Sequence, residues 1–345
     1  MRVEMQADYV EFAASVTSGE LARLLGVLAP GVFSAEWAEE DVVTAKESLA
    51  EAGGNAMEDV SAADKLHSLF QRALWGDCPW TQPMWGTEET REQITLADVR
   101  GFYRTFYVPG ISSLCIVSPY SDAEVFDMAR AAFGAFEAKQ VSEVEAVQSR
   151  VTQSQVETDI SPALENAMLL VGVPLPPVGS DGFARAMVIY GALSGPEGLL
   201  SADKSIATGL TLADRIGVGQ MNPIEVMPIT LSSHPSLAVL AKAVPTAVES
   251  TREGILRHLL GFSDRLLTDE ELQRAKLRAI NLNALAMDQP ESLASITNRV
   301  AMVGVENPYG GDFSARVMAV TAEDLRAFAR QQFTRHAIAL LLPEA

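Results

Sequence analysis

The first apolar residues of the chain alternate with polar or small ones, and the spacing then becomes helical. The alternation from Val10 to Val16 predicts a strand with one buried face. After Ser18, leucines at positions 21, 24, 25 and 28 form the stripe of an amphipathic helix. Pro30 and Gly31 follow, and we expect them to end this helix.

The same pattern of apolar positions continues through the rest of the chain. Further helices are predicted over 35–52, around 66–74, and over 95–106, 122–136, 182–193, 249–262, 269–287 and 321–333. Further strands are predicted over 111–117, 167–173, 210–216, 225–232, 237–244 and 337–342. A polar stretch over 137–157 is interpreted as a linker, with a domain boundary near residue 148. The alternation of elements predicts sheets covered by helices.

One phrase of the sequence occurs twice. ITLADVRGFYRTFY at 94–107 is matched by VTAEDLRAFARQQF at 320–333, with five identities 226 positions apart. In the first copy Thr95 and Asp98 have the spacing of a capping box, in which each side chain accepts from the other residue's backbone N–H. Capped amphipathic helices can converge on such sequences, but an apolar strand follows both copies. We therefore predict an α+β protein with two tandem homologous α/β domains, residues 1–147 and 148–345.

Composition excludes several classes of function. Lys and Arg number 26 against 45 Asp and Glu, a formal net charge of −19, which repels nucleic acid and anionic lipid. No apolar run reaches the roughly 18 residues of a membrane helix, and the start does not resemble a signal peptide. We expect a cytoplasmic protein without a membrane or nucleic-acid partner. Cys78 and Cys115 are too few for a disulfide framework and are expected to be small buried residues.

Two longer stretches resemble the M16 zinc peptidases, the family of pitrilysin, insulinase and the mitochondrial processing peptidase. The first runs from LHSLFQRALWG to SSLCIVS over 66–118, and the residues that carry the match are Gly86, Thr87, Glu88, Tyr107 and Pro109. The second is LTDEELQRAKLRAINLNALAMDQPESLASITNRVA over 267–301, where Glu271, Leu272, Ala275 and Lys276 match. The resemblance extends over nearly the whole chain and implies tandem homologous α/β domains.

The family resemblance also implies a zinc site, which this sequence does not complete. M16 peptidases bind zinc through His-x-x-Glu-His, in which the glutamate is the general base. The histidines at positions 67, 234, 258 and 336 do not have that spacing. Relative to the family, the first domain is truncated at its start, before which the motif would stand. No catalytic residue is therefore assigned, and zinc is not an expected cofactor.

A third family ligand is a glutamate that ends a Glu-x6-Glu arrangement, and Glu40 and Glu47 have that spacing. The resemblance places Glu47 at the metal-ligand position, with Glu40 in support. The alternative is that this helix simply presents a solvated acidic face. The family's substrate-holding Arg and Tyr would fall near Leu199 and Leu212, with Arg215 close by, so substrate-binding residues stay unassigned.

These observations predict an M16-like protein that is non-catalytic alone and serves as a partner, a scaffold or a peptide-binding relative. Two alternatives stay open: a subunit of an active zinc-dependent heterodimer, and a zinc peptidase whose His-x-x-Glu-His segment is missing from this sequence. The partners expected are a subunit that bears the motif, or a second copy of the chain, and a peptide.

Overall fold

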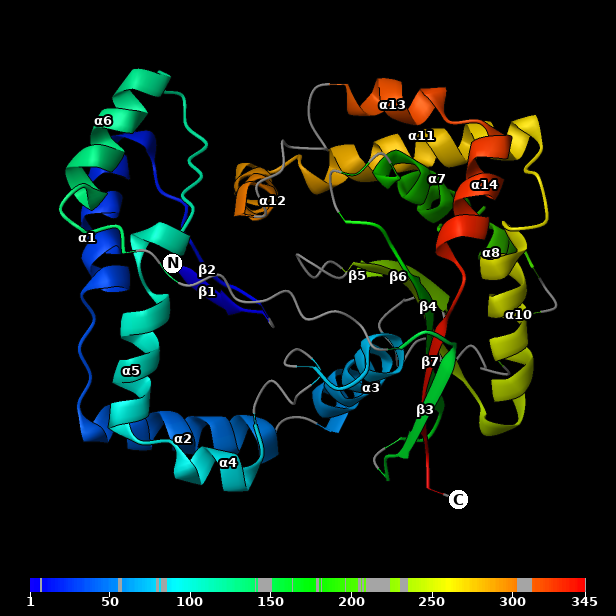
Figure 1. The fold of residues 1–345 in the computed structure, drawn as a ribbon, viewed down its shortest axis with the longest axis horizontal. Coiled ribbons are helices and arrows are strands. Elements are labelled where there is room, and N and C mark those ends of the chain that lie inside the picture. The colour runs from blue at the N-terminus through cyan, green and yellow to red at the C-terminus, as the bar shows by residue number, and fades with distance from the viewer. Residues whose placement is uncertain are drawn as a thin grey trace. The chain divides into compact units, whose positions relative to one another are not determined.

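The fold is described from a computed structural model (Figure 1). It describes residues 1–345 except 7, 55–57, 79–80, 82–85, 140, 142–150, 163, 178–179, 181, 196, 204–205, 207, 209–223, 230–234, 303–311 and 345. The chain forms two compact units. Unit 1 comprises Met1–Asn55, Trp85–Ala146 and Ala286–Glu306, and unit 2 comprises Ala56–Met84, Val147–Leu285 and Asn307–Ala345.

The two units exchange helices along the sequence. Helix α3 (Glu58–Trp75) comes from the first half of the chain but belongs to unit 2, and α12 (Pro290–Met302) comes from the second half but belongs to unit 1. The predicted domains, residues 1–147 and 148–345, were defined by the similarity of the two halves of the sequence and not by compactness. They stay a prediction. The compact units differ from them by these two helical segments.

Unit 1 combines a β-hairpin with helices. The hairpin pairs β1 (Arg2–Met5) with β2 (Val10–Ala13) in antiparallel register, with Glu4 opposite Glu11. Its other elements are η1 (Ser18–Glu20), α1 (Leu21–Phe33), α2 (Glu39–Gly54), α4 (Glu88–Gln93), α5 (Leu96–Phe106), η3 (Pro109–Ile111), α6 (Asp122–Phe133) and α12. Strand β1 was not predicted, because the alternation of polar and apolar residues in RVEM extends over only four positions.

Unit 2 contains a five-stranded sheet in the order β3-β7-β4-β6-β5. Strands β3 and β7 are parallel, and the other neighbours are antiparallel. The strands are β3 (Gln155–Ile160), β4 (Ala167–Pro174), β5 (Ile224–Ile229), β6 (Ser236–Ala243) and β7 (Ala337–Leu342). The helices besides α3 are α7 (Phe183–Leu193), α8 (Leu199–Ala202), η4 (Pro245–Ala247), α10 (Val248–Gly261), α11 (Asp269–Ala286), α13 (Phe313–Ala319) and α14 (Ala322–Gln332).

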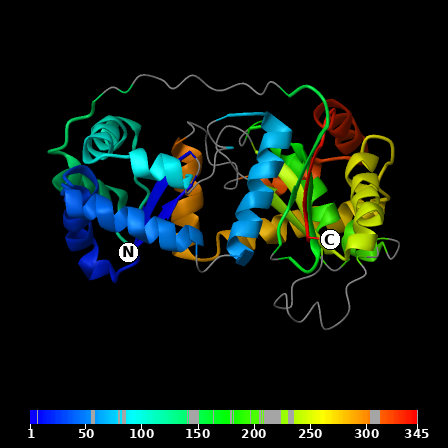
Figure 2. The same cartoon turned by 90° about the horizontal axis from the view of Figure 1, so that it is seen from below.

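Helices cover both faces of this sheet. On one face, Leu169 and Val171 of β4 pack in a cluster with Ile255 and Leu259 of α10. On the other face, Leu170 of β4 packs in a cluster with residues of α3, which lies along the sheet in both views (Figures 1 and 2). Strand β4 is buried on both faces, so its sequence AMLLVGVP is a continuous apolar run.

The repeated phrase forms the same local structure twice, as predicted. Thr95 caps α5 and Thr321 caps α14, and both form reciprocal capping boxes with the aspartate three residues on. Thr268 and Glu271 form a third such pair at the start of α11. The mixed α+β class predicted from the sequence is confirmed.

Several predicted boundaries are wrong, each for a local reason. Helix α1 continues through Pro30 to Phe33: the proline removes one backbone hydrogen bond and crowds the preceding turn, but the next turn still closes through the Ser34 N–H, which donates to the Pro30 carbonyl. The end of the supposed linker forms β3, an exposed edge strand whose polar residues hide its pairing with β7. Helices α12 and α13 were missed. The strand predicted over 210–216 lies outside the described residues.

The strand predicted over 111–117 is the most informative error. Pro109–Ile111 is a 3-10 turn, and residues 112–118 carry no regular secondary structure. The apolar pattern of this segment matches a strand, but a strand also requires neighbours for its backbone groups. Its environment is part of the candidate site.

Candidate functional site

Unit 1 contains a cleft of about 830 Å³, within the size range of ligand pockets. Four parts of the unit line it: the β1–β2 hairpin with the residues that follow it, helix α1, residues 114–119, and helix α12 with the residues just before it. No histidine is among the described residues that line it.

One wall of the cleft is apolar. Leu21, Leu24, Leu25 and Leu28, the stripe predicted from the sequence, point one face of α1 at the cleft. Leu114 and Val117 line it as well, although their side chains are 45% and 43% exposed. Apolar side chains that stay this exposed mark a surface that can gain from further burial.

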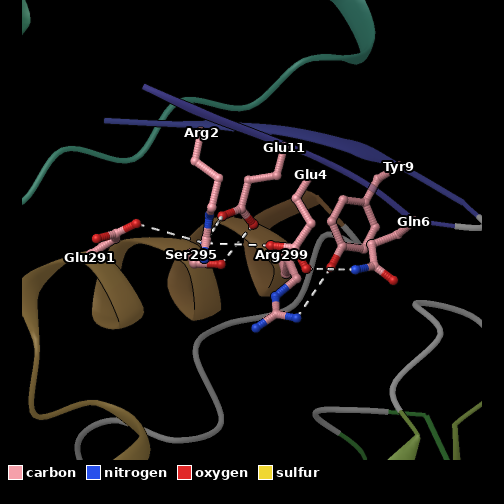
Figure 3. Close-up of polar contacts among 8 residues, drawn as sticks. All are labelled: Arg2, Glu4, Gln6, Tyr9, Glu11, Glu291, Ser295 and Arg299. Atoms are coloured by element: carbon pink, nitrogen blue, oxygen red, sulfur yellow. Dashed lines mark hydrogen bonds and ion pairs between the residues drawn. The ribbon is translucent and has the colours of Figure 1, made fainter. Parts of the chain in front are cut away.

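The opposite wall carries charge, at the contact between the hairpin and α12 (Figure 3). The Ser295 hydroxyl donates to Glu11 Oε2 at 2.7 Å. Arg2 lies between three carboxylates, 3.4 Å from Glu4, 3.7 Å from Glu11 and 3.8 Å from Glu291. These contacts hold α12 against the hairpin.

Glu11 is the most buried carboxylate of this wall, with a side chain 10% exposed. Its Oε1 atom accepts no hydrogen bond from the described residues, and Arg2 Nη2 lies 3.7 Å away from it. A buried carboxylate oxygen without a hydrogen bond is costly, so a donor that reached Oε1 would stabilise the site. Sequence reasoning placed Glu11 on the solvent face of its strand. Only the position of α12 reveals that it is buried.

Tyr9 and Arg299 form a second contact on this wall. Arg299 Nη1 donates to the Tyr9 hydroxyl at 3.2 Å. Burial raises the pKa of Tyr9, and the contact with Arg299 opposes part of that rise. The phenol is thus protonated at neutral pH. It can itself donate a hydrogen bond to a bound molecule.

Cys115 lines the cleft next to these groups and is half-buried, whereas Cys78 is buried in unit 2. Neither cysteine forms a disulfide with a described residue, and burial raises the pKa of Cys115. A thiol with a raised pKa is a weak nucleophile at neutral pH. Cys115 therefore serves better as a reporter of the cleft than as a reactive group.

The predicted metal residues lie elsewhere in unit 1. Glu40 and Glu47 are both exposed on helix α2. Within the described part of the chain, no group of three or more His, Cys, Asp or Glu side chains is placed to hold a metal ion. The assignment of Glu47 as a ligand stays a prediction.

Three of the four histidines lie in unit 2, each beside a different polar group. His67 lies 3.3 Å from Gln71, His258 lies 2.7 Å from Asp203, and His336 lies 2.9 Å from Ser154. His234 lies outside the described residues. The structure does not bring the three described histidines to one site.

The predicted positions of the substrate-holding residues are only partly described. Leu199 begins helix α8 and lines a smaller cleft of about 260 Å³ in unit 2. Arg274 and Arg278 of α11 line the same cleft. Leu212 and Arg215 lie outside the described residues, so the assignment is not resolved.

Among the helices of the described residues, none has the length and apolar character needed to cross a bilayer. The predicted cytoplasmic location is not addressed by this finding and stays a prediction.

Comparison with known proteins finds similarity to M16 peptidase-like proteins. The sequence profile of the family described as "Peptidase M16 inactive domain" matches residues 93–215. An uncharacterized zinc protease of Streptomyces coelicolor is 23% identical over 340 residues, which cover 95% of this chain and 70% of that protein.

Solved structures agree with this placement at the level of the fold. A peptidase M16 inactive domain from Pseudomonas fluorescens superposes with a TM-score of 0.77 at 14% identity, covering 95% of this chain and 76% of that one. A protease from Helicobacter pylori gives a TM-score of 0.72, also at 14% identity, over 95% and 78% of the two chains. The chain is therefore similar in sequence and fold to M16 peptidase-like proteins, and the given sequence contains no His-x-x-Glu-His motif.

Proposed function

We propose that this chain is a non-catalytic M16-like protein that binds peptide segments and acts as the partner or scaffold subunit of a peptidase complex. The observation that carries the proposal is the combination of an M16-like fold with a sequence that lacks His-x-x-Glu-His. Two imidazoles one helical turn apart and a general base are the elements of that chemistry, and Glu47 cannot replace them.

The cleft of unit 1 supports the peptide-binding part of the proposal. It offers an apolar wall of leucines and a wall with hydrogen-bonding and charged groups, such as Tyr9 and Glu11. Such a combination suits a peptide, whose side chains are apolar in part and whose backbone carries donors and acceptors.

The test compares the purified chain alone with the chain mixed with an M16 subunit that bears the zinc motif. We expect the chain alone to contain no stoichiometric zinc and to leave a quenched fluorescent peptide uncut. Zinc at one equivalent per chain, together with cleavage that EDTA stops, would overturn the proposal. The variants Glu47→Gln and Glu40→Gln provide the matched comparison, because neither should alter the zinc content of a chain that holds none.

The second candidate is a subunit that contributes to zinc-dependent proteolysis in a heterodimer. The similarity to a protein described as a zinc protease, over 95% of this chain, favours it. The mixture should then cleave peptide faster than the motif-bearing subunit alone, and replacing the motif glutamate of that subunit should abolish the activity. If mixing brings no gain and the two proteins do not co-purify, this second candidate is refuted.

A further inference from the structure

The smaller cleft of unit 2 lies where helix α11 meets the turn between α7 and α8. Its volume is about 260 Å³, which suits a ligand smaller than a typical drug. Helix α11 lines it with Glu271, Arg274, Arg278 and Asn281. These four residues are three, four and three positions apart, so they occupy one face of the helix. The cleft is therefore a small site with a polar wall.

Two glycines bring the elements around this cleft close together. A Cβ on Gly191 of α7 would lie 2.3 Å from the Ala275 carbonyl oxygen, so α7 and α11 approach through their backbones. Gly195 of the turn has a φ of +84°, and a Cβ there would lie 3.0 Å from Arg278 Cζ. The Arg278 guanidinium therefore lies directly against the turn.

The Arg278 guanidinium is a cation without an anionic partner. Within the described part of the chain it forms no ion pair and no hydrogen bond, and its Nε atom is buried without an acceptor. The neighbouring Arg274, in contrast, pairs with Glu270 at 2.7 Å. The chain has 45 Asp and Glu residues, yet none of the described ones neutralises Arg278. A partly buried guanidinium in this state indicates a site for an external anion.

Ser194 is a second group of this cleft without a partner. It is 9% exposed, and its hydroxyl oxygen is buried without a hydrogen bond to a described residue. Its backbone N–H donates to the Tyr190 carbonyl at 3.0 Å, which leaves the hydroxyl unused. A serine side chain has three staggered χ1 positions, so this hydroxyl can turn toward a ligand. Arg278 and Ser194 thus offer donors to one anionic group.

The other residues of the cleft restrict which anion fits. Glu197 lines the cleft, is exposed and forms no ion pair with a described residue. Its carboxylate repels a doubly charged phosphate and attracts a cationic group beside the anion. Leu199 and Leu277 add apolar surface, and the Leu277 side chain is 55% exposed. A molecule that combines a carboxylate, an ammonium group and an apolar side chain matches all three features.

We infer that this cleft binds a free apolar α-amino acid of about the size of leucine. The α-carboxylate contacts Arg278 and Ser194, because a guanidinium presents its donors in a planar fork that matches two carboxylate oxygens. The α-ammonium group faces Glu197, and the apolar side chain covers Leu199 and Leu277. The inference goes beyond the proposed function, since it holds whether or not the chain joins a peptidase complex.

The experiment titrates the full chain with four small molecules in a calorimeter. L-leucine carries both charges, N-acetyl-leucine lacks the ammonium group, leucinamide lacks the carboxylate, and inorganic phosphate lacks the side chain. We expect saturable one-to-one binding of leucine. N-acetyl-leucine should bind at least threefold more weakly, and leucinamide and phosphate at least tenfold more weakly.

Two results of this titration would refute a free amino acid as the ligand. Phosphate that binds more tightly than leucine would make the cleft an inorganic oxyanion site. An acetylated tripeptide that ends in leucine and binds as tightly as leucine would make it a site for the C-terminus of a peptide.

Matched arginine variants locate the site. Arg326 of α14 is partly buried like Arg278, forms no ion pair with a described residue and does not line the cleft. Arg278→Gln should weaken leucine binding at least tenfold, and Arg326→Gln should leave it unchanged, with circular dichroism to check that both variants are folded. Equal effects of the two variants, or unchanged binding in Arg278→Gln, would overturn the inference.

The Glu197→Gln variant tests the ammonium contact separately. It should weaken leucine binding at least threefold and leave the binding of N-acetyl-leucine unchanged, because that molecule has no ammonium group. An equal loss for both molecules would contradict the assigned role of Glu197.

Methyl NMR distinguishes this cleft from other surfaces. Leu277 and Leu285 are both exposed residues of α11, at 55% and 71%, but only Leu277 is among the residues that line the cleft. Addition of leucine should shift the methyl resonances of Leu277 and not those of Leu285. Binding that leaves Leu277 unshifted would refute the site. Loss of leucine binding in Arg278→Gln should not affect co-purification with a motif-bearing subunit, so the two proposals fail separately.

Discussion

Helix α3 provides the sharpest test of the fold, because it stabilises a sheet that belongs to the other half of the sequence. Phe70 of α3 is fully buried and packs in a cluster with Leu170, Ala339 and Leu341 of the sheet in unit 2. We predict that Phe70→Ala destabilises unit 2 by about 3–5 kcal/mol, the usual cost of removing a buried phenylalanine side chain. This is a large fraction of the roughly 5–15 kcal/mol that stabilises a typical domain.

Hydrogen exchange under native conditions measures this loss strand by strand. Since each 1.4 kcal/mol is about a factor of ten, the most protected amides of β4 and β7 should exchange about two to three and a half orders of magnitude faster. Amides of α1, in unit 1, should keep their rates. The control is Phe126→Ala on α6, whose side chain is 67% exposed and whose loss should cost no more than about 0.5 kcal/mol. The reasoning fails if Phe70→Ala costs less than about 1 kcal/mol, or if it speeds exchange in α1 rather than in β4.

Four further predictions concern single residues. Thr321→Ala should lower the free energy of unfolding by about 1 kcal/mol, because it removes the N-terminal cap of α14. Thermal unfolding measures this loss, and an unchanged stability would contradict the assigned capping box. Hydrogen bonds from Thr321 lower the pKa of Asp324 in the folded protein. The Asp324 carboxylate therefore stabilises the fold at pH values above its unfolded pKa of about 3.9. This stabilisation is lost as the pH falls through the lower pKa of the folded state. Acid unfolding of Asp324→Asn should therefore lack this pH-dependent part, and an unchanged acid profile would refute it. A Cβ at Gly172 would lie 2.4 Å from a backbone oxygen and 2.8 Å from the Phe70 ring. Gly172→Ala should therefore lower the free energy of unfolding by about 1–3 kcal/mol, measured by denaturant titration. An unchanged free energy of unfolding would contradict the close packing of α3 on β4. Lys276 is 5% exposed, and its Nζ donates a hydrogen bond to the Met318 carbonyl at 2.9 Å. Lys276→Ala should therefore lower the free energy of unfolding by about 1.5–3 kcal/mol in the same assay. No loss of stability would show that this hydrogen bond is absent in solution.

The sequence predicted those parts of the site whose signals are local. The leucine stripe of α1 and the two capping boxes follow from spacing alone, because a helix places residues three and four apart on one face. The apolar segment over 111–117 was also recognised as strand-like. Among the described residues this segment pairs with no strand, and a sequence pattern cannot reveal whether a strand has a neighbour.

The charged wall of the cleft could not be predicted in the same way. Glu11 alternates with apolar residues, so it was assigned to a solvent face, and Ser295 and Arg299 lie far along the chain in a helix that was not predicted. Their contact with β2 depends on α12 packing against the first unit. No local pattern encodes such a long-range exchange.

The sequence by itself determined the α+β class, the repeated capped helix and the absence of a His-x-x-Glu-His motif, because each depends on residues close together in the chain. Only the tertiary structure decided that the two halves exchange helices, that Glu11 is buried, and that residues 114–119 line a cleft. Burial and strand pairing depend on neighbours from distant parts of the chain, and these become defined only when the units are assembled.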